Sequence, residues 1–181
     1  MTSLRGQLLV ASPALVDPNF HRTVVLVAEH SDEGALGFVL NRPSEASVGE
    51  VVPVLDSLVD GDEAIHFGGP VERSGVVLLA EFDDPSEAAR VVFADVGFLA
   101  ADPEGDDSEA ATRRVRVFAG HSGWGPGQLE TELERDDWIV AAPDPDDVFC
   151  DEPSELWSAV LARKGGQYSL LARMPPDPSM N

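Results

Sequence analysis

Short apolar runs, separated by glycine, proline and charged residues, recur along most of the chain. The clearest are residues 23–30 (TVVLVAEH) and 35–41 (ALGFVLN), which flank the polar stretch SDEG. Runs of this length that are rich in β-branched and aliphatic residues are typical of strands buried on both faces. The pattern therefore predicts a hairpin of two buried strands joined by a short polar turn.

Several other segments have the length and composition of strands. They are expected at residues 6–12, 64–71, 75–82, 91–100, 114–124 and 138–143, and the closing YSLLARMP is expected to form one more. Residues 64–71 and 75–82 are predicted to pair with each other through the glycines between them. Residues 114–124 alternate arginine with apolar residues, so this strand should have one charged face and one apolar face.

Helical patterns are fewer, and most occur late in the chain. Residues 47–58 begin with Ser47 and carry Glu50 three positions on, the pattern of a capping box, although an internal proline limits the helix to one or two turns. Residues 128–138 predict a short helix with acidic early turns, and residues 152–165 predict a final helix with an apolar stripe. Strands outnumber helices, which indicates an α+β fold with a mixed, curled sheet.

Length and composition are those of an ordinary globular domain. The chain has 181 residues, of which 43% are hydrophobic, so residues 1–181 are predicted to form one domain around a full core. Residues 101–113 (ADPEGDDSEAATR) are acidic and lack large apolar side chains. They are expected to form an exposed, mobile loop rather than a linker between domains.

The charge balance and the cysteine content exclude several classes of function. There are 33 acidic and 12 basic residues, a formal net charge of −21 that would repel a polyanion, so direct nucleic-acid binding is disfavoured. The lone cysteine, Cys150, cannot form an intramolecular disulfide, which favours a reducing compartment. The apolar run near the start of the sequence, LLVA at residues 8–11, is too short for a signal sequence or a membrane span. The protein is therefore expected in the cytoplasm, away from membranes.

The glycine-rich stretch GHSGWGPGQLE, residues 120–130, is the strongest candidate for a site. It fits no catalytic or nucleotide-binding template. A nucleophile elbow around Ser122 needs glycine at the position of Trp124, and a dinucleotide loop needs its third glycine at the position of Gln128. The lysine of a P-loop is absent. What remains is a strand, a turn and a helix start, which can direct backbone N–H groups at an anion. The alternative interpretation is a tight turn without a ligand.

Histidines and arginines are the other candidate site residues. His121 and Ser122 are adjacent on a predicted strand and should point to opposite faces, which makes them a poor catalytic pair. The histidines also lack the spacing of a zinc site. Arg22, Arg42 and Arg73 lie at strand ends, and a curled sheet could gather them into a local positive site. The alternative is that each pairs with one of the many carboxylates.

Several motifs resemble the YqgE/AlgH family of small bacterial proteins, also designated UPF0301. They are GQLLVASPALVDPNFHRTVVLVAEHSDEGALGFVLNRP, FGGPV, GHSGWGPGQLETEL with the DDW that follows, and SLLARMPPDPSMN, in that order from Gly6 to the C-terminus. The resemblance implies a cytosolic α+β protein whose bifurcated sheet is curled into a pseudo-barrel, with a few short helices packed around it. It implies no established enzyme activity, cofactor or catalytic residue; one branch is named as a candidate transcriptional regulator of alginate synthesis. His121 and Ser122 replace a tyrosine and an alanine of the usual GYAGW, so a mechanism common to the family does not depend on them.

Three functional hypotheses follow. The preferred one is a non-enzymatic binding or regulatory module that binds a small anion or a protein partner and needs no metal, cofactor or catalytic residue. Its cleft is expected to be lined by Arg22, Asn41, Arg42, Gly68, Gly69, Gly123, Trp124 and Gly125. The second is an enzyme of unassigned type, hydrolase-like, that uses Ser122 or His121. The third is a DNA-binding transcriptional regulator, which both the charge and the lack of a helix-turn-helix pattern disfavour.

Overall fold

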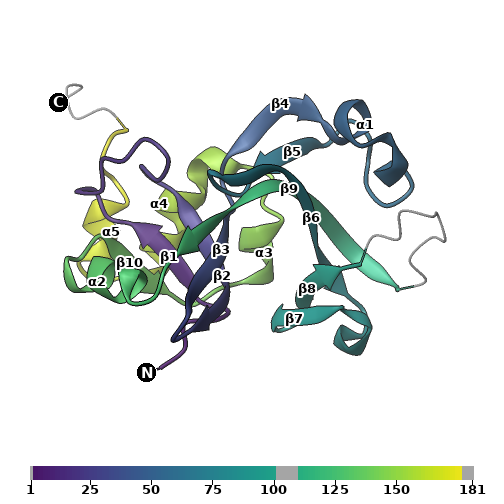
Figure 1. Cartoon of the computed structure of the whole chain (residues 1–181). Coiled ribbons are helices and arrows are strands. Elements are labelled where there is room, and N and C mark those ends of the chain that lie inside the picture. Colours follow the sequence, from purple (N-terminus) through teal and green to yellow (C-terminus); the bar gives the residue numbers. More distant parts are fainter. Residues whose placement is uncertain (1, 101–109, 177–181) are drawn as a thin grey trace.

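The computed structural model describes residues 2–100 and 110–176 (Figure 1). These residues form one mixed sheet, in the order β10-β1-β2-β3-β9-β6-β8-β7, with β5 and then β4 branching from β9. The strands are β1 (Leu8–Ala11), β2 (Val24–Ser31), β3 (Gly34–Val39), β4 (Pro43–Ser47), β5 (Ala64–Phe67), β6 (Val71–Phe82), β7 (Arg90–Phe93), β8 (Val96–Leu99), β9 (Thr112–Trp124) and β10 (Trp138–Ala141). The expected α+β class with a mixed sheet is confirmed, and so is the β2–β3 hairpin.

The long strand β9 is the point at which the sheet branches. Along one edge it pairs with β6 in antiparallel fashion. Along the other edge it pairs with β5 in parallel at Phe118 and Ala119, and then with β3 in antiparallel fashion from Ser122 to Trp124. Figure 1 shows β9 connecting the part of the molecule that holds β1–β3 with the part that holds β6–β8.

The expected pairing of residues 64–71 with residues 75–82 is wrong. β5 and β6 lie on opposite edges of β9 and do not pair with each other in the part of the chain that the structure describes. The glycines between them do not form a hairpin turn, because Gly68 continues along β9 and donates its N–H to the Ala119 carbonyl at 2.9 Å.

The sheet is open. Its end strands, β10 and β7, do not pair with each other within the described residues. Closure into a pseudo-barrel therefore stays a prediction.

The helical segments are short. They are α1 (Val48–Val51), the 3-10 turns η1 (Pro53–Leu55) and η2 (Pro85–Glu87), α2 (Gln128–Glu134), α3 (Pro145–Val148), α4 (Pro153–Lys164) and α5 (Tyr168–Leu171). The capping box is confirmed: the Ser47 hydroxyl accepts the Glu50 N–H, and the Glu50 carboxylate accepts the Ser47 N–H at 3.0 Å. The expected limit to the first helix is also confirmed, because α1 ends before Pro53 and that proline begins η1.

Helix α4 covers one side of the sheet near β1 and β10 (Figure 1). Its apolar stripe, predicted from the sequence, is buried and consists of Leu156, Trp157, Val160 and Leu161. The Trp157 indole N–H donates to the Ala11 carbonyl of β1 at 2.8 Å, so the largest side chain of the stripe is also fixed by a hydrogen bond. A second apolar cluster contains Trp124, Trp138 and Leu129 and joins β9 and β10 to α2.

Three sequence-based expectations need correction. The closing segment YSLLARMP is not a strand: Tyr168–Leu171 form helix α5, and the Ala172 N–H donates to the Tyr168 carbonyl. Residues 144–149 (DPDDVF), whose composition predicts turns rather than a helix, contain helix α3, because Asp144 forms a second capping box there. The expected loop 101–113 is shorter at its end, since β9 already begins at Thr112; residues 101–109 lie outside the described residues.

Candidate functional site

A small cavity lies where the segment before β2, the β3–β4 junction and the β5–β6 connection meet. Its volume is about 140 Å³. The lining residues are Asn19, Val39, Arg42, Phe67, Gly69, Pro70 and Arg73. Two of these carry a guanidinium and none carries a carboxylate, in a chain whose net charge is −21. The cavity is therefore a local exception to the acidic character of the protein.

Arg42 is held by main-chain acceptors rather than by acidic side chains. Its Nη2 donates to the His21 carbonyl at 2.7 Å, and its Nη1 lies 3.4 Å from the Pro18 carbonyl oxygen. Partial burial lowers the pKa of Arg42, but a guanidinium stays protonated at any physiological pH. Among the described residues Arg42 has no carboxylate partner, so it brings an uncompensated positive charge to the cavity wall.

The segment that supplies Asn19 is fixed by a turn and an aromatic anchor. The Asp17 carboxylate accepts the Asn19 N–H at 2.9 Å, which forms an Asx turn. Phe20, the next residue, packs edge-on against Trp138 with ring centroids 5.6 Å apart and stacks near Trp124 at 6.3 Å. This packing ties one wall of the cavity to the Trp124–Trp138 cluster.

Gly69 brings main chain to the opposite wall. Its φ of +153° and the space around it both require glycine, because a Cβ at this position would lie 2.3 Å from the carbonyl carbon and oxygen of His121. Its N–H makes no hydrogen bond within the described residues. Gly69 can therefore offer a backbone donor to a ligand without a side chain in the way.

Arg73 projects from an irregular part of β6. The pairing of β6 with β9 shifts between Val71 and Val76, and Glu72 has a φ of +50°, which is uncommon for a residue with a side chain. Arg73 is exposed, and within the described residues its guanidinium makes neither a hydrogen bond nor an ion pair. It is the second cation of the cavity and the one with the fewest contacts.

Only part of the site predicted from the sequence surrounds this cavity. Of the expected residues, Arg42 and Gly69 line it. Gly68 is adjacent, and its carbonyl accepts hydrogen bonds from the Val39 N–H at 2.8 Å and the Ser122 hydroxyl at 3.1 Å. The β3–β4 junction and the end of β5 lie side by side, since the Phe67 N–H donates to the Arg42 carbonyl at 2.8 Å.

Arg22 and Asn41 have other contacts. The Arg22 guanidinium lies 4.0 Å from the ring centroid of Trp157 and donates to the Met174 carbonyl. The Asn41 amide bridges two backbone segments, accepting the Val24 N–H at 3.0 Å and donating to the Arg22 carbonyl at 2.9 Å. Both side chains therefore hold the start of β2 in place rather than line the cavity.

The turn of residues 123–127 is satisfied by its own surroundings. The Gln128 side chain accepts the Gly125 N–H at 3.0 Å. The Trp124 indole N–H donates to Glu132, which also accepts the Trp138 indole N–H at 2.8 Å. Gly123, Trp124 and Gly125 do not line the cavity. In this turn the glycines serve the chain reversal and the docking of α2.

Ser122 is not placed as a nucleophile. The residue is fully buried, and its hydroxyl donates to the Gly68 carbonyl at 3.1 Å. Within the described residues it makes no hydrogen bond with a histidine or a carboxylate, which catalysis by an activated serine requires. His121 is partly exposed and pairs across the ladder with Val71. The hydrolase hypothesis thus loses its main support.

The other histidines are held individually. His30 accepts the Leu4 N–H at its Nδ1 and bonds Glu130 through its Nε2 at 2.8 Å, an arrangement that requires the neutral Nε2–H tautomer. His66 is 3% exposed, and burial, followed by the charge of Arg116, lowers its pKa to about 4. The part of the chain that the structure describes contains no cluster of three or more metal-ligating side chains.

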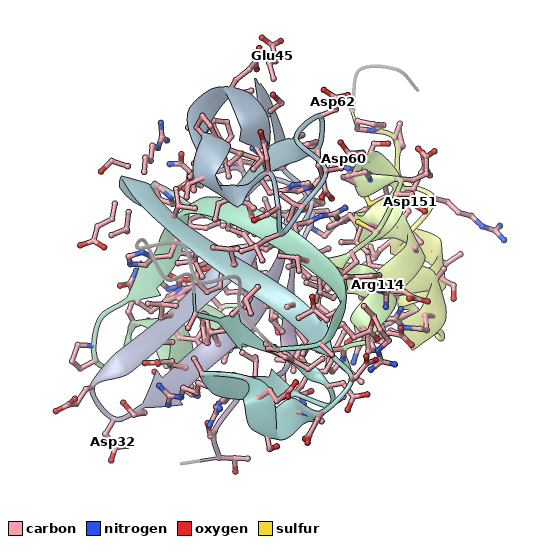
Figure 2. All side chains as sticks on the ribbon, turned by 90° about the vertical axis from the view of Figure 1, so that its right-hand side faces the viewer. Asp32, Glu45, Asp60, Asp62, Arg114 and Asp151 are labelled. Carbon is pink, nitrogen blue, oxygen red and sulfur yellow. The ribbon has the colours of Figure 1, made fainter. Side chains whose placement is uncertain are left out.

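A second cavity, of about 310 Å³, lies on another face of the molecule. Figure 2 labels three of its lining residues, Asp60, Arg114 and Asp151, which come from separate parts of the chain. Its arginines are already compensated: Arg114 pairs with Glu81 and Asp146 at 2.7 Å, and the buried Arg116 donates to two backbone carbonyls and to Glu63. This cavity is a less suitable site for an anion than the one between Arg42 and Arg73.

Five residues of the first cavity were not among the residues predicted for the cleft: Asn19, Val39, Phe67, Pro70 and Arg73. Arg73 is one of the three arginines at strand ends, and this pattern is the sequence signal that points to the cavity. The remaining four carry no local signal, because they come from three segments that only the sheet brings together.

The molecule is thus an α+β protein with a branched sheet and a small arginine-lined cavity. The chain belongs to the AlgH-like family, whose family model matches residues 8–169. Among the described residues, no helix combines the length and apolar composition needed to cross a bilayer.

Relatives match over almost the whole chain. A UPF0301 protein of Mycobacterium bovis is 44% identical over 97% of this chain and 90% of its own length. One of Streptomyces coelicolor is 38% identical over 100% of this chain and 97% of its own length. The fold matches a crystal structure of a Corynebacterium diphtheriae protein with a TM-score of 0.83 and 31% identity, covering 96% of this chain and 94% of that one. It also matches the solution structure of the AlgH protein from Pseudomonas aeruginosa with a TM-score of 0.72 and 28% identity, covering 97% of both chains.

Proposed function

We propose that the protein is a non-enzymatic binding module whose cavity holds a small anion between Arg42 and Arg73. The observation that carries the proposal is the pair of guanidinium groups in one cavity whose described lining residues include no carboxylate. Arg73 makes no ion pair within the described residues, although the chain has 33 acidic residues. An anion would supply the missing counter-charge, with the Gly69 N–H and the Asn19 side chain as further donors.

We also propose that the protein is cytoplasmic and that its sheet is curled into a pseudo-barrel. A cytoplasmic location is supported by the lone cysteine, Cys150, which is a half-buried free thiol. The curl is supported by contacts of the N-terminal segment with the end strand β7: the Arg5 guanidinium donates to the Val91 carbonyl, and Gly6 lies against Val92. A regulatory role, including one in transcription, would then act through the bound anion or a protein partner rather than through direct contact with DNA.

Binding of inorganic phosphate tests the proposal. A ligand that binds only the native state raises the melting temperature by mass action, so phosphate should raise the Tm of the wild-type protein at low ionic strength. The amide signal of Gly69 should shift in a two-dimensional NMR titration. Arg73→Ala should weaken phosphate binding at least about tenfold, the loss expected for one charge-assisted contact.

Arg135→Ala is the matched control. Arg135 is exposed at the end of α2 and, like Arg73, makes no side-chain hydrogen bond or ion pair within the described residues. Its removal changes the net charge by the same amount but should leave phosphate binding intact. An equal loss of binding in both variants would indicate a general charge effect, and no response of the wild-type protein to phosphate would refute the proposal.

A further inference from the structure

The cavity is small for a complete ligand. Its volume of about 140 Å³ is well below the roughly 300–1,000 Å³ of pockets that enclose drug-sized molecules. An anionic head group fits between the two arginines, but little else does. Whatever is attached to the head group must lie outside, on the surface next to the cavity.

That adjacent surface is apolar. Phe67 is 46% exposed and Val71 is 40% exposed, and Pro70 stands between them in the chain. Among the described residues Phe67 is the only aromatic side chain among the large hydrophobic residues that are exposed. An exposed aromatic ring beside a charged cavity is a common feature of binding sites and has no role in packing the core.

The main-chain segments that carry the ring and the charge are hydrogen-bonded to each other. The Phe67 N–H donates to the Arg42 carbonyl at 2.8 Å, and Phe67 also pairs with Ala119 of β9. Gly123 borders Val71 without a side chain of its own, since a Cβ there would meet only the Val71 Cγ2 at 3.9 Å. Phe67 and Val71 are therefore open to solvent and lie at the ends of strands β5 and β6, with Pro70 in the connection between them.

On this basis, and resting on the proposed function, we infer that the natural ligand is a small organic anion with an apolar tail. Its carboxylate or phosphate lies between Arg42 and Arg73, and its alkyl or aryl group lies on Phe67 and Val71. Charge complementarity selects the head group, and burial of apolar surface selects the tail. An inorganic anion uses only the first half of this site.

Three related ligands separate the two halves: acetate, hexanoate and hexanamide. Each fully buried methylene group adds about fourfold to affinity, so hexanoate, with part of its tail covered, should bind the wild-type protein at least about tenfold more tightly than acetate. Hexanamide has the same tail without the charge and should bind far more weakly than hexanoate. Affinities are measured by NMR titration of the amide signals around Gly69.

Two variants test whether the preference for hexanoate over acetate comes from the apolar surface of Phe67 and Val71. Phe67→Ala should bring the affinities of hexanoate and acetate to within about threefold of each other, because the tail loses its largest contact. Val54→Ala is the control: Val54 is 59% exposed but lies in η1, away from the cavity, and its replacement should leave the preference intact.

The outcomes distinguish this inference from the proposed function. If phosphate and acetate bind but hexanoate binds no better than acetate, or if Phe67→Ala keeps the preference, the inference is wrong and the anion site stands. If none of the anions binds, both fall. Two other results would overturn the inference. If hexanamide binds as tightly as hexanoate, the surface binds apolar groups without regard to charge. If the protein forms a dimer that Phe67→Ala dissociates, the surface is a contact with a second copy of the chain.

Discussion

Replacing His66 by leucine should make the free energy of unfolding less sensitive to mild acid. The imidazole is 3% exposed, and its Nε2 has no hydrogen-bond partner within the described residues. Its ring packs against Phe118, with centroids 5.9 Å apart. Burial, and after it the positive charge of Arg116, lowers the pKa of His66 from 6.5 to about 4. The folded protein therefore resists protonation at this position.

The sign and size of the effect follow from proton linkage. In the unfolded chain His66 takes up a proton near pH 6.5, and in the folded protein only near pH 4. Between these values the unfolded state binds more protons, so the free energy of unfolding falls as the pH falls. Each pH unit in this window costs about 1.4 kcal/mol, so the wild-type protein should lose about 2 kcal/mol through this residue on going from about pH 7.5 to about pH 5. Leucine has no titrating group and avoids that loss.

The measurement is urea unfolding, followed by tryptophan fluorescence at both pH values. The substitution leaves every carboxylate in place, so the difference between the two proteins isolates His66. His121→Gln is the control, since it removes a histidine from β9 but keeps His66, and it should retain the wild-type loss. If His66→Leu loses as much stability in acid as the wild type does, the link between burial of this imidazole and acid sensitivity is refuted.

Three further substitutions test the framework of the cavity, each by urea unfolding. Gly69→Ala should lower the free energy of unfolding by about 3 kcal/mol or more, because its Cβ would meet the His121 carbonyl. Gly127→Ala is the control: Gly127 also has a positive φ but has open space around it, so its substitution should cost about 1–2 kcal/mol. Equal losses would contradict the steric argument. Asn41→Ala should cost about 2 kcal/mol through its two backbone hydrogen bonds, and a neutral effect would show that water replaces them. Ser122→Ala should cost about 1 kcal/mol and leave phosphate binding unchanged, and a large loss of binding at unchanged stability would reopen the question of its role.

Local patterns in the sequence predicted the elements whose determinants are local. The β2–β3 hairpin joins two apolar runs across a short polar turn, so neighbouring residues decide both strands and turn. The capping box at Ser47 and the buried stripe of α4 likewise depend on residues three or four positions apart. The segment YSLLARMP failed the same test, because a short apolar run fits a strand and a helix equally well, and its helical form comes from packing after α4.

The candidate site depends on contacts that no local pattern contains. β5 pairs in parallel with β9, about fifty residues further along the chain, and its antiparallel pairing with β4 places Phe67 beside Arg42. The periodicity of residues 64–71 predicts a strand but not which side chain is left exposed at its end. Arginines at strand ends were the one useful signal, and even there Arg22 turned away to stack on Trp157.

The pairing of β9 with three strands also has a consequence for how the chain is synthesised. Its partners β3, β5 and β6 all precede it, so a ribosome completes them before the strand that joins them exists. Until Trp124 has left the ribosome, each of those three strands has an unpaired edge that can pair incorrectly. Such non-native pairing is a risk for folds in which most contacts join distant parts of the chain. The walls of the cavity consequently assemble late and together, only after β9 has been synthesised.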